Sequence, residues 1–514
     1  MDKLISIEGE RIEIRFPYSI GMVKAVKQIP LVRWDRGAVA WWCPKSPITA
    51  KIVREFGNQH KFTIDGRIVD LANDDHKTVE VDRSPLYDYQ KVGVDFIHDN
   101  NGTCMLSDSM GLGKTLQAIW YMMEADTQRN LIVAPASVLY KWQDEFAKWA
   151  EWEADVIAKT KQPLGNARVQ VMSYDIMSRR AVELMDRNYD MIVADEFHRL
   201  KSGTAKRTMA FQMLTASKKL FLSGTPMLNR PVELFPVLNM INPVSFGNYW
   251  SYVNRYCNAK KVQYGTRKFT DVNGASNIEE LKHKLSTVML RRTKQDVLKE
   301  LPELTRSVIQ LDLSNKKEYR QGVSDLRSSI KKGRAEAVTK LTYLRQVTGL
   351  GKVDGTVELA TDILDSNPEG KLVVYAHHKS VVKKLVEAFK DYGVDTIVGD
   401  DSNVRRASVM KAFQNNSIPR VLVISSAGGE GVDLFKADNV IIAELPWHNG
   451  ALSQIEGRLH RIGQTLPVTS YIMVAKNTVD EHVLRLIERK LEISANIIGE
   501  PSVETALLDL LKEV

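Results

Sequence analysis

A glycine-rich segment that ends in lysine and threonine carries the strongest chemical signal in the chain. It reads SDSMGLGKT at residues 107–115, between an apolar run at 103–106 and an amphipathic stretch at 116–125. Backbone N–H groups at a helix start bind phosphate oxygens, a lysine adds positive charge near the β- and γ-phosphates, and a threonine hydroxyl binds Mg²⁺. The segment predicts a nucleotide site, with an ordinary glycine-rich turn as the alternative, because the general pattern has glycine where Asp108 stands. The residues of this predicted site are Asp108, Ser109, Met110, Gly111, Leu112, Gly113, Lys114 and Thr115.

Two carboxylates follow an apolar run later in the chain. The run at 191–194 leads into Asp195 and Glu196. A parallel strand delivers the residues that follow it to the carboxyl edge of the sheet, where a phosphate loop also lies. Asp195 is therefore predicted to hold Mg²⁺, and Glu196 to orient or deprotonate the attacking water. A lone Asp-Glu pair after a strand is more often a solvated loop, and the earlier phosphate loop is what favours the catalytic interpretation.

A pair of arginines occurs in the segment QIEGRLHRIGQ at 454–464. On a helix, Arg458 and Arg461 would share one face, because residues three apart are neighbours there. Such a pair suits arginine fingers, which stabilise the charge that develops during phosphoryl transfer. Taken alone, it is more often a partner in surface ion pairs.

The elements that must position these residues follow from the hydrophobic pattern. From Ser84 onward, short apolar runs alternate with amphipathic stretches at helical spacing, which is typical of βαβ units. We expect an α/β protein with two doubly wound parallel-sheet domains, a charged helical insertion or bridge at 314–346, and a small α+β domain at the amino terminus. The expected strands are 103–106, 131–134, 169–173, 191–194 and 220–222, then 371–376, 394–398, 420–425, 439–443 and 469–474.

Composition excludes several classes of protein. Of the 514 residues, 44% are hydrophobic and 26% charged, so a mainly disordered chain is excluded. The sequence has no run of about 18 apolar residues and no apolar segment at its start, and we expect neither a membrane span nor secretion. Three cysteines without paired spacing support neither a disulfide framework nor a cysteine zinc site. The net charge of +8 favours polyanionic partners only mildly.

The amino-terminal segment is basic and rich in rings. Its first 67 residues hold 12 Lys or Arg and 7 Asp or Glu. Trp34, Trp41, Trp42 and Phe56 lie among the basic residues. Interleaved rings and cations suit nucleic-acid contact, whereas rings can equally fill the core of a small domain. Both interpretations stay open.

Six motifs together resemble a known family. Their order resembles that of superfamily-two helicases, and their residues resemble those of the Swi/Snf-type DNA-dependent ATPases. The resemblance runs from about residue 86 to about residue 491. Asp108 agrees with the usual loop of this family, whereas Ser109 departs from its usual glutamate. The motifs are the phosphate loop, the DEAH-like box DEFH at 195–198, SGTP at 223–226, RRTKQDV at 291–297, AGGEG at 427–431 and the 454–464 segment.

The resemblance implies two RecA-like domains with ATP and Mg²⁺ between them. The residues it implies for catalysis are Lys114, Glu196, Arg458 and Arg461, and those for Mg²⁺ are Thr115 and Asp195. The further residues it implies for ATP binding are Gln90 as adenine reader, Gly429 and Gln454. The residues it implies for the DNA backbone or the interdomain cleft are Thr225, Arg291, Arg292, Ser426 and Trp447. Arg291 and Arg292 could instead lie on a surface helix, and Trp447 in a core.

The segment from Tyr18 to Trp41 resembles the HARP domain that precedes the motor in annealing helicases. If so, this domain would read DNA structure and feed it to the motor. The expected boundaries are 1–80 for the HARP-like domain, 84–300 for the first RecA-like domain, 301–355 for the helical bridge, 356–499 for the second RecA-like domain and 500–514 for a carboxyl-terminal helix.

The expected function is that of an ATP-driven translocase or remodelling helicase on duplex or branched DNA, in replication, recombination or repair. A strand-separating helicase and a DNA-binding scaffold with an inactive nucleotide site are the alternatives. The layout shows no chromatin-reading module and is similar to bacterial or bacteriophage members. We therefore expect a monomer in the cytoplasm of a bacterium or of a phage-infected host.

Overall fold

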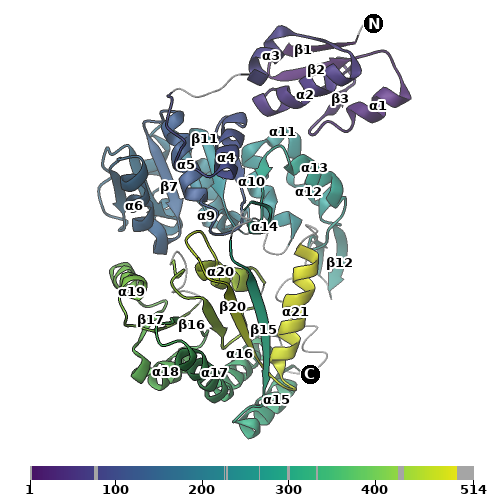
Figure 1. Cartoon of the computed structure of the whole chain (residues 1–514). Helices are drawn as coiled ribbons and strands as arrows, with labels where there is room; N and C mark the ends of the chain where they lie inside the picture. The colour runs from purple at the N-terminus through teal and green to yellow at the C-terminus, as the bar shows by residue number, and fades with distance from the viewer. Residues whose placement is uncertain are drawn as a thin grey trace. The chain divides into compact units, whose positions relative to one another are not determined.

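Two separate parallel β-sheets organise the chain (Figure 1). The computed structural model describes residues 3–73, 79–224, 226, 230–264, 267–297, 301–330, 334–425, 433–447 and 449–494. The chain divides into a first unit of residues 1–109 and 113–293 and a second unit of residues 294–514 with the loop residues 110–112.

An amino-terminal α+β domain is present, as predicted. Its five-stranded sheet has the order β3-β4-β2-β1-β5, in which only β1 and β5 are parallel neighbours. Ile5, Ile12 and Ile14 point into a core that also holds Phe56. The elements are β1 (Leu4–Glu8), β2 (Arg11–Arg15), α1 (Ile20–Val26), β3 (Arg33–Asp35), β4 (Ala40–Pro44), α2 (Pro47–His60), β5 (Thr63–Ile64) and α3 (Gly66–Asn73).

The rest of the first unit is built on a seven-stranded sheet. Its order is β14-β6-β11-β10-β7-β9-β8, and every pairing is parallel. Met191 and Val193 pack into the apolar cluster on one face, and Ile192 and Ala194 into the cluster on the other. Strands that are buried on both faces consist of continuous apolar runs, and for this reason they could be predicted from the sequence.

The elements of this domain run in chain order as α4 (Asp88–Asp99), β6 (Cys104–Leu106), α5 (Lys114–Glu124), β7 (Asn130–Ala134), α6 (Leu139–Trp149), β8 (Ala154–Ile157), β9 (Val169–Ser173), α7 (Tyr174–Arg179), α8 (Ala181–Met185), β10 (Tyr189–Asp195), α9 (Lys206–Met213), β11 (Ala216–Leu222), α10 (Phe235–Ile241), α11 (Pro243–Phe246), α12 (Tyr249–Tyr256), β12 (Lys260–Tyr264), β13 (Arg267–Asp271), α13 (Ile278–Leu285) and β14 (Met289–Leu290).

The second unit has a six-stranded parallel sheet of order β15-β20-β19-β16-β18-β17. Apolar clusters again cover both of its faces. The elements are α14 (Lys294–Val297), β15 (Leu304–Leu311), α15 (Lys316–Ile330), α16 (Arg334–Gly351), α17 (Val353–Ser366), β16 (Leu372–Tyr375), α18 (Lys379–Ala388), β17 (Val394–Ile397), α19 (Asn403–Asn415), β18 (Val421–Ile424), β19 (Asn439–Ile442), α20 (Asn449–Leu459), β20 (Val468–Ala475) and α21 (Val479–Ser494).

The predicted fold class is confirmed: each expected strand overlaps an observed one. The edge strands β8, β14 and β15 were not predicted. β15 lies in the stretch assigned to a helical bridge, yet it pairs along its length with β20. Its residues alternate between half-buried and exposed positions, so its apolar signal is weak. The domain boundaries stay predictions, and the expected helix at 500–514 lies outside the described residues.

Across the helices that the structure describes, none combines the length and apolar character needed to cross a bilayer.

Candidate active site

The glycine-rich loop connects β6 to the amino end of α5, as predicted. Gly113 has a φ of 72°, and a Cβ added there would lie 2.3 Å from Nε2 of Gln90. Both the left-handed backbone and this close approach require glycine. Gln90 of α4 is buried against the start of α5, with its Oε1 accepting a hydrogen bond of 3.1 Å from the Tyr87 N–H. The predicted adenine reader and the predicted phosphate loop are therefore neighbours.

Lys114 folds back over the loop that precedes it. Its Nζ donates to the backbone oxygen of Asp108 at 2.7 Å. Its charge also lowers the pKa of both Asp195 and Glu196. The structure thus brings together the lysine and the two carboxylates that were predicted from separate motifs.

Asp108 is fully buried and forms an ion pair with Arg292. The Arg292 Nε donates to Oδ1 of Asp108 at 3.0 Å, and Nη2 lies 2.5 Å from Oδ2. The Arg292 side chain is only 12% exposed and also donates to the Tyr89 carbonyl. A buried carboxylate of the loop therefore occupies the Arg292 guanidinium group, and the expected contact of Arg292 with the DNA backbone or the interdomain cleft stays a prediction.

Asp195 ends β10 at the carboxyl edge of the sheet. The indole Nε1 of Trp142 donates to its Oδ2 at 2.9 Å, and the Tyr174 hydroxyl donates to its backbone oxygen at 2.8 Å. The family resemblance places Trp142 in a segment after the phosphate loop but gives it no bonding partner, because spacing does not reveal a bond between residues 53 positions apart. These two donors fix the orientation of the predicted magnesium ligand.

Glu196 follows Asp195 in the chain, but its backbone conformation and its side-chain partners differ from those of Asp195. Its φ of 54° and ψ of 53° are in the left-handed region, which is uncommon for residues other than glycine. The Ser223 hydroxyl donates to Oε2 of Glu196 at 3.1 Å, and Nδ1 of His198 lies 3.2 Å from the same oxygen. Ser223 follows β11, the strand beside β10, so the two strand ends meet as parallel neighbours do.

The pKa values of the two carboxylates are shifted in opposite directions. Burial, and then the charge of Glu196, raise the pKa of Asp195 to about 6, against the Trp142 and Lys114 contributions. Burial also acts to raise the pKa of Glu196, but the hydrogen bond and charge of His198, with Lys114 and Ser223, bring that pKa below its ordinary value. Glu196 therefore stays ionised as a weak base, which favours orienting a water over deprotonating it.

The oxygen donors fit Mg²⁺ that arrives with a nucleotide. Asp195 supplies a carboxylate and Thr115, at the start of α5, a hydroxyl, and both are hard ligands of the kind this cation prefers. The raised pKa of Asp195 shows an uncompensated charge that a divalent cation would stabilise. Among the described residues, no group of at least three His, Cys, Asp or Glu could hold a metal alone. Nucleotide-bound Mg²⁺ needs only one or two protein groups, because phosphates and waters complete its shell.

In the second unit, the two predicted arginine fingers do not share a helical face. Arg458 lies on α20, which ends at Leu459, so Arg461 lies beyond the helix. Directly after the helix, His460 Nε2 donates to the Pro302 carbonyl at 2.7 Å. Arg461 forms an ion pair with Asp433. Gln454, one turn before Arg458, does share its face of α20.

The remaining residues predicted to contact DNA have mixed surroundings. Arg291 is exposed. Trp447 is half-buried against the apolar cluster of the second unit, and the Arg345 guanidinium lies 3.9 Å from its ring centroid. The core interpretation of Trp447 is thus partly supported. Thr225, Ser426 and Gly429 lie outside the described residues.

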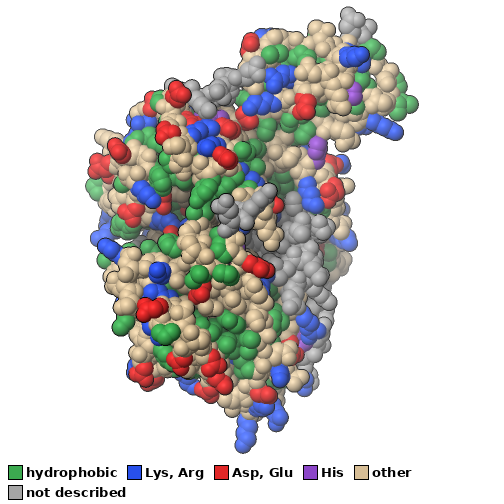
Figure 2. Space-filling model, viewed as in Figure 1, with side chains coloured by type: hydrophobic (Ala, Val, Ile, Leu, Met, Phe, Trp, Pro, Cys, Tyr) green, Lys and Arg blue, Asp and Glu red, His purple; other side chains and the backbone are tan. Residues whose placement is uncertain are grey.

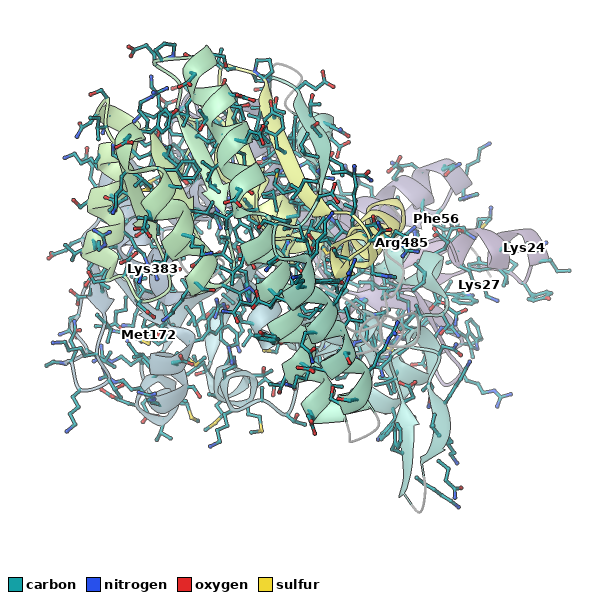
Figure 3. All side chains as sticks on the ribbon, turned by 90° about the horizontal axis from the view of Figure 1, so that it is seen from below. Lys24, Lys27, Phe56, Met172, Lys383 and Arg485 are labelled. Carbon is teal, nitrogen blue, oxygen red and sulfur yellow. The ribbon has the colours of Figure 1, made fainter. Side chains whose placement is uncertain are left out.

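The amino-terminal domain divides its rings between core and surface. Trp42 and Phe56 are buried, whereas Trp34 is 49% exposed. Lys24 and Lys27 of the α1 region lie at the outer edge of the domain (Figure 3). Lys and Arg side chains are visible on the face of this domain that Figure 2 shows. Trp41 is half-buried against the core of the domain, so Trp34 is the exposed ring among the four.

Two protein-family profiles match most of the chain. The SNF2-related domain profile matches residues 89–349, about half of the chain, and the helicase conserved C-terminal domain matches residues 355–463. The chain belongs to the SNF2 family. The SNF2-family chain is 33% identical over 447 residues to the mouse "DNA annealing helicase and endonuclease ZRANB3", an alignment that covers 81% of this chain and 41% of the relative.

The alignment with a second relative covers more of this chain. The Caenorhabditis elegans homologue of "SWI/SNF-related matrix-associated actin-dependent regulator of chromatin subfamily A-like protein 1" is 30% identical, over 95% of this chain and 75% of the relative. That alignment includes part of the amino-terminal domain, because the 5% of the chain it omits is fewer residues than the domain contains. This SNF2-family chain spans about two fifths of the length of the ZRANB3 relatives.

Among solved structures, the "Sulfolobus solfataricus SWI2/SNF2 ATPase core in complex with dsDNA" is similar with 24% identity and a TM-score of 0.40, over 85% of this chain and 95% of that one.

Proposed function

We propose that this chain is an ATP-driven translocase or remodelling helicase whose ATP hydrolysis is stimulated by DNA. The observation that carries the proposal is the separation of the two neighbouring carboxylates at the phosphate loop. Asp195, held by Trp142, suits a cation, and ionised Glu196, held by Ser223 and His198, suits the positioning of a water. A scaffold without hydrolysis would have no use for this arrangement.

Each residue has a separate task in the proposed reaction. Lys114 and the loop N–H groups bind the phosphates, and Gln90 contacts the adenine. Mg²⁺ bound with the nucleotide would neutralise charge on the phosphates. Asp195 and Thr115 would hold that cation, and Glu196 would orient the attacking water. Arg458 and Arg461 would complete the site from the second unit, so that hydrolysis requires closure.

The proposed substrate is duplex or branched DNA, in replication, recombination or repair. The relatives include a DNA annealing helicase, which supports this substrate. The HARP-like nature of the amino-terminal domain, a monomeric state, and a bacterial or bacteriophage origin with a cytoplasmic location belong to the same proposal and stay predictions.

The test is the ATPase rate without DNA and with single-stranded, duplex and forked DNA. We expect stimulation by duplex or forked DNA, and no hydrolysis by Lys114→Ala, which lacks the charge at the phosphates. A wild-type protein that hydrolyses no ATP on any DNA would support the inactive scaffold. Stimulation by single-stranded DNA alone would support the strand-separating helicase.

A further inference from the structure

A β-hairpin leaves the first unit between α12 and α13. Its strands, β12 and β13, are antiparallel and, among the described residues, pair only with each other. Figure 1 labels β12, and Figure 3 shows the hairpin extending clear of the helices of its own unit. No residue of the nucleotide site lies in it.

The base of this hairpin is anchored. Ala259 and Val272, directly before and after the two strands, pack against the apolar core. The Ser276 hydroxyl accepts a hydrogen bond of 3.1 Å from the Asn258 N–H and donates to the Arg255 carbonyl at 2.7 Å. The base of the hairpin is therefore fixed to the domain, while its two strands, among the described residues, pair with no other sheet.

The two faces of the arm differ in chemistry. Val262 and Phe269 are directly opposite in register and are 37% and 53% exposed. Because side chains alternate along a strand, Lys261 and Lys268 lie together on the other face. Both lysines are exposed, and no carboxylate in the described part of the chain pairs with either. Residues 260–271 contain four Lys or Arg and one Asp, a net charge of +3.

We propose that this hairpin contacts branched DNA where two strands part, with the lysine face on backbone phosphates and Phe269 on an exposed base. The inference rests on the proposed function and names the DNA structure that it uses. Lysines without carboxylate partners bind phosphate oxygens irrespective of sequence. An exposed ring on a hairpin with an anchored base can stack on bases, but continuous duplex hides its base faces. Phe269 therefore finds a partner only at a branch, gap or end.

The test separates the two faces. The variants are Lys261→Ala with Lys268→Ala for the charged face, and Phe269→Ala with Phe269→Tyr for the ring. Lys383→Ala with Lys384→Ala, on exposed positions of α18, removes the same charge elsewhere. Each protein is titrated with forked DNA and with closed circular duplex at several salt concentrations, and its melting temperature is measured.

We expect the lysine variant to bind forked DNA more weakly and with a salt slope shallower by about 1 to 2. Phe269→Ala should weaken fork binding about 5- to 100-fold and leave closed duplex binding unchanged, while Phe269→Tyr retains the wild-type affinity. The α18 control should match wild type. A variant with residues 260–271 replaced by a short Gly-Ser linker should keep its ATPase activity on closed duplex.

Unchanged fork affinity in the Phe269 and lysine variants would overturn the inference. Equal loss on forks and closed duplex would also overturn it, in favour of a general DNA contact. A Phe269→Ala change in oligomeric state at unchanged fork affinity would assign the face to a protein contact instead. Absence of any DNA stimulation in the wild-type enzyme would remove the proposed function itself, which is a separate outcome.

Discussion

Asp108 and Arg292 form a buried ion pair that ties the phosphate loop to the end of the first unit, with Nη2 2.5 Å from Oδ2, although the two residues are 184 positions apart in the chain. The Arg292 N–H also donates to Oδ1 of Asp108, at 3.1 Å. The aspartate that stands where the general loop pattern has glycine thus anchors the loop through its bonds with Arg292.

Removing Arg292 should therefore damage folding and nucleotide binding together. Arg292→Ala leaves the Asp108 carboxylate buried and unpaired, which costs about 3–5 kcal/mol. We expect a lower melting temperature and weaker ATP binding, with little rescue in Arg292→Lys because lysine cannot form the two parallel bonds. Arg291→Ala, at an exposed neighbour, is the control and should keep the melting temperature. An Arg292→Ala protein that loses only DNA affinity would contradict the anchoring role.

The Trp142 hydrogen bond should be visible in the pH dependence of hydrolysis. The indole N–H lowers the pKa of Asp195, so Trp142→Phe should raise that pKa above its present value of about 6. Because Mg²⁺ needs the ionised carboxylate, the acid limb of the ATPase profile should move to higher pH, with a larger loss at pH 6 than at pH 8. Trp149→Phe, which removes an indole bonded to Glu145, serves as control. Equal loss at every pH would indicate packing alone.

Asp195→Asn should abolish hydrolysis but stabilise the fold without nucleotide. The folded pKa of Asp195, about 6, exceeds its ordinary 3.8, so the folded state holds the proton more tightly and loses stability as the pH rises between these values. Removing the charge should raise the melting temperature by about a few degrees at pH 8 and leave it unchanged below pH 4. A lower melting temperature at pH 8 would show that the charge is stabilised by another group.

Glu196→Gln should separate nucleotide binding from hydrolysis. The amide cannot orient the water as a carboxylate does, so we expect hydrolysis to fall at least about tenfold while ATP affinity stays near wild type. Ser223→Ala, which removes one donor to Glu196, should give a smaller loss of kcat. Equilibrium binding of a fluorescent ATP analogue and single-turnover hydrolysis measure the two effects. Loss of ATP affinity in Glu196→Gln would assign this residue to cation binding.

The arginines of the second unit should act on hydrolysis and not on binding to the first. We expect that Arg458→Ala, Arg461→Ala or both lose DNA-stimulated hydrolysis, because a finger contributes about 10³- to 10⁵-fold to phosphoryl transfer. Asp433→Asn, which releases Arg461 from its ion pair, tests whether that pair positions the arginine. Stimulation unchanged in both arginine variants would exclude the finger role for each.

Local sequence patterns were enough to predict the candidate catalytic residues and the strands of the two parallel sheets. Strands buried on both faces are continuous apolar runs, and the phosphate loop and the Asp195–Glu196 pair are contiguous segments, so each could be recognised without its partners. Edge strands such as β15 were missed because half-exposed residues dilute that signal.

Only the tertiary structure decided how these groups are held. The bonds from Arg292 to Asp108, from Trp142 to Asp195 and from Ser223 to Glu196 each join segments that are far apart in the chain. The left-handed backbone at Glu196 and the end of α20 before Arg461 likewise depend on neighbours outside their own motifs. Spacing within a motif carries no information about such partners, because packing of the sheets and loops brings them together.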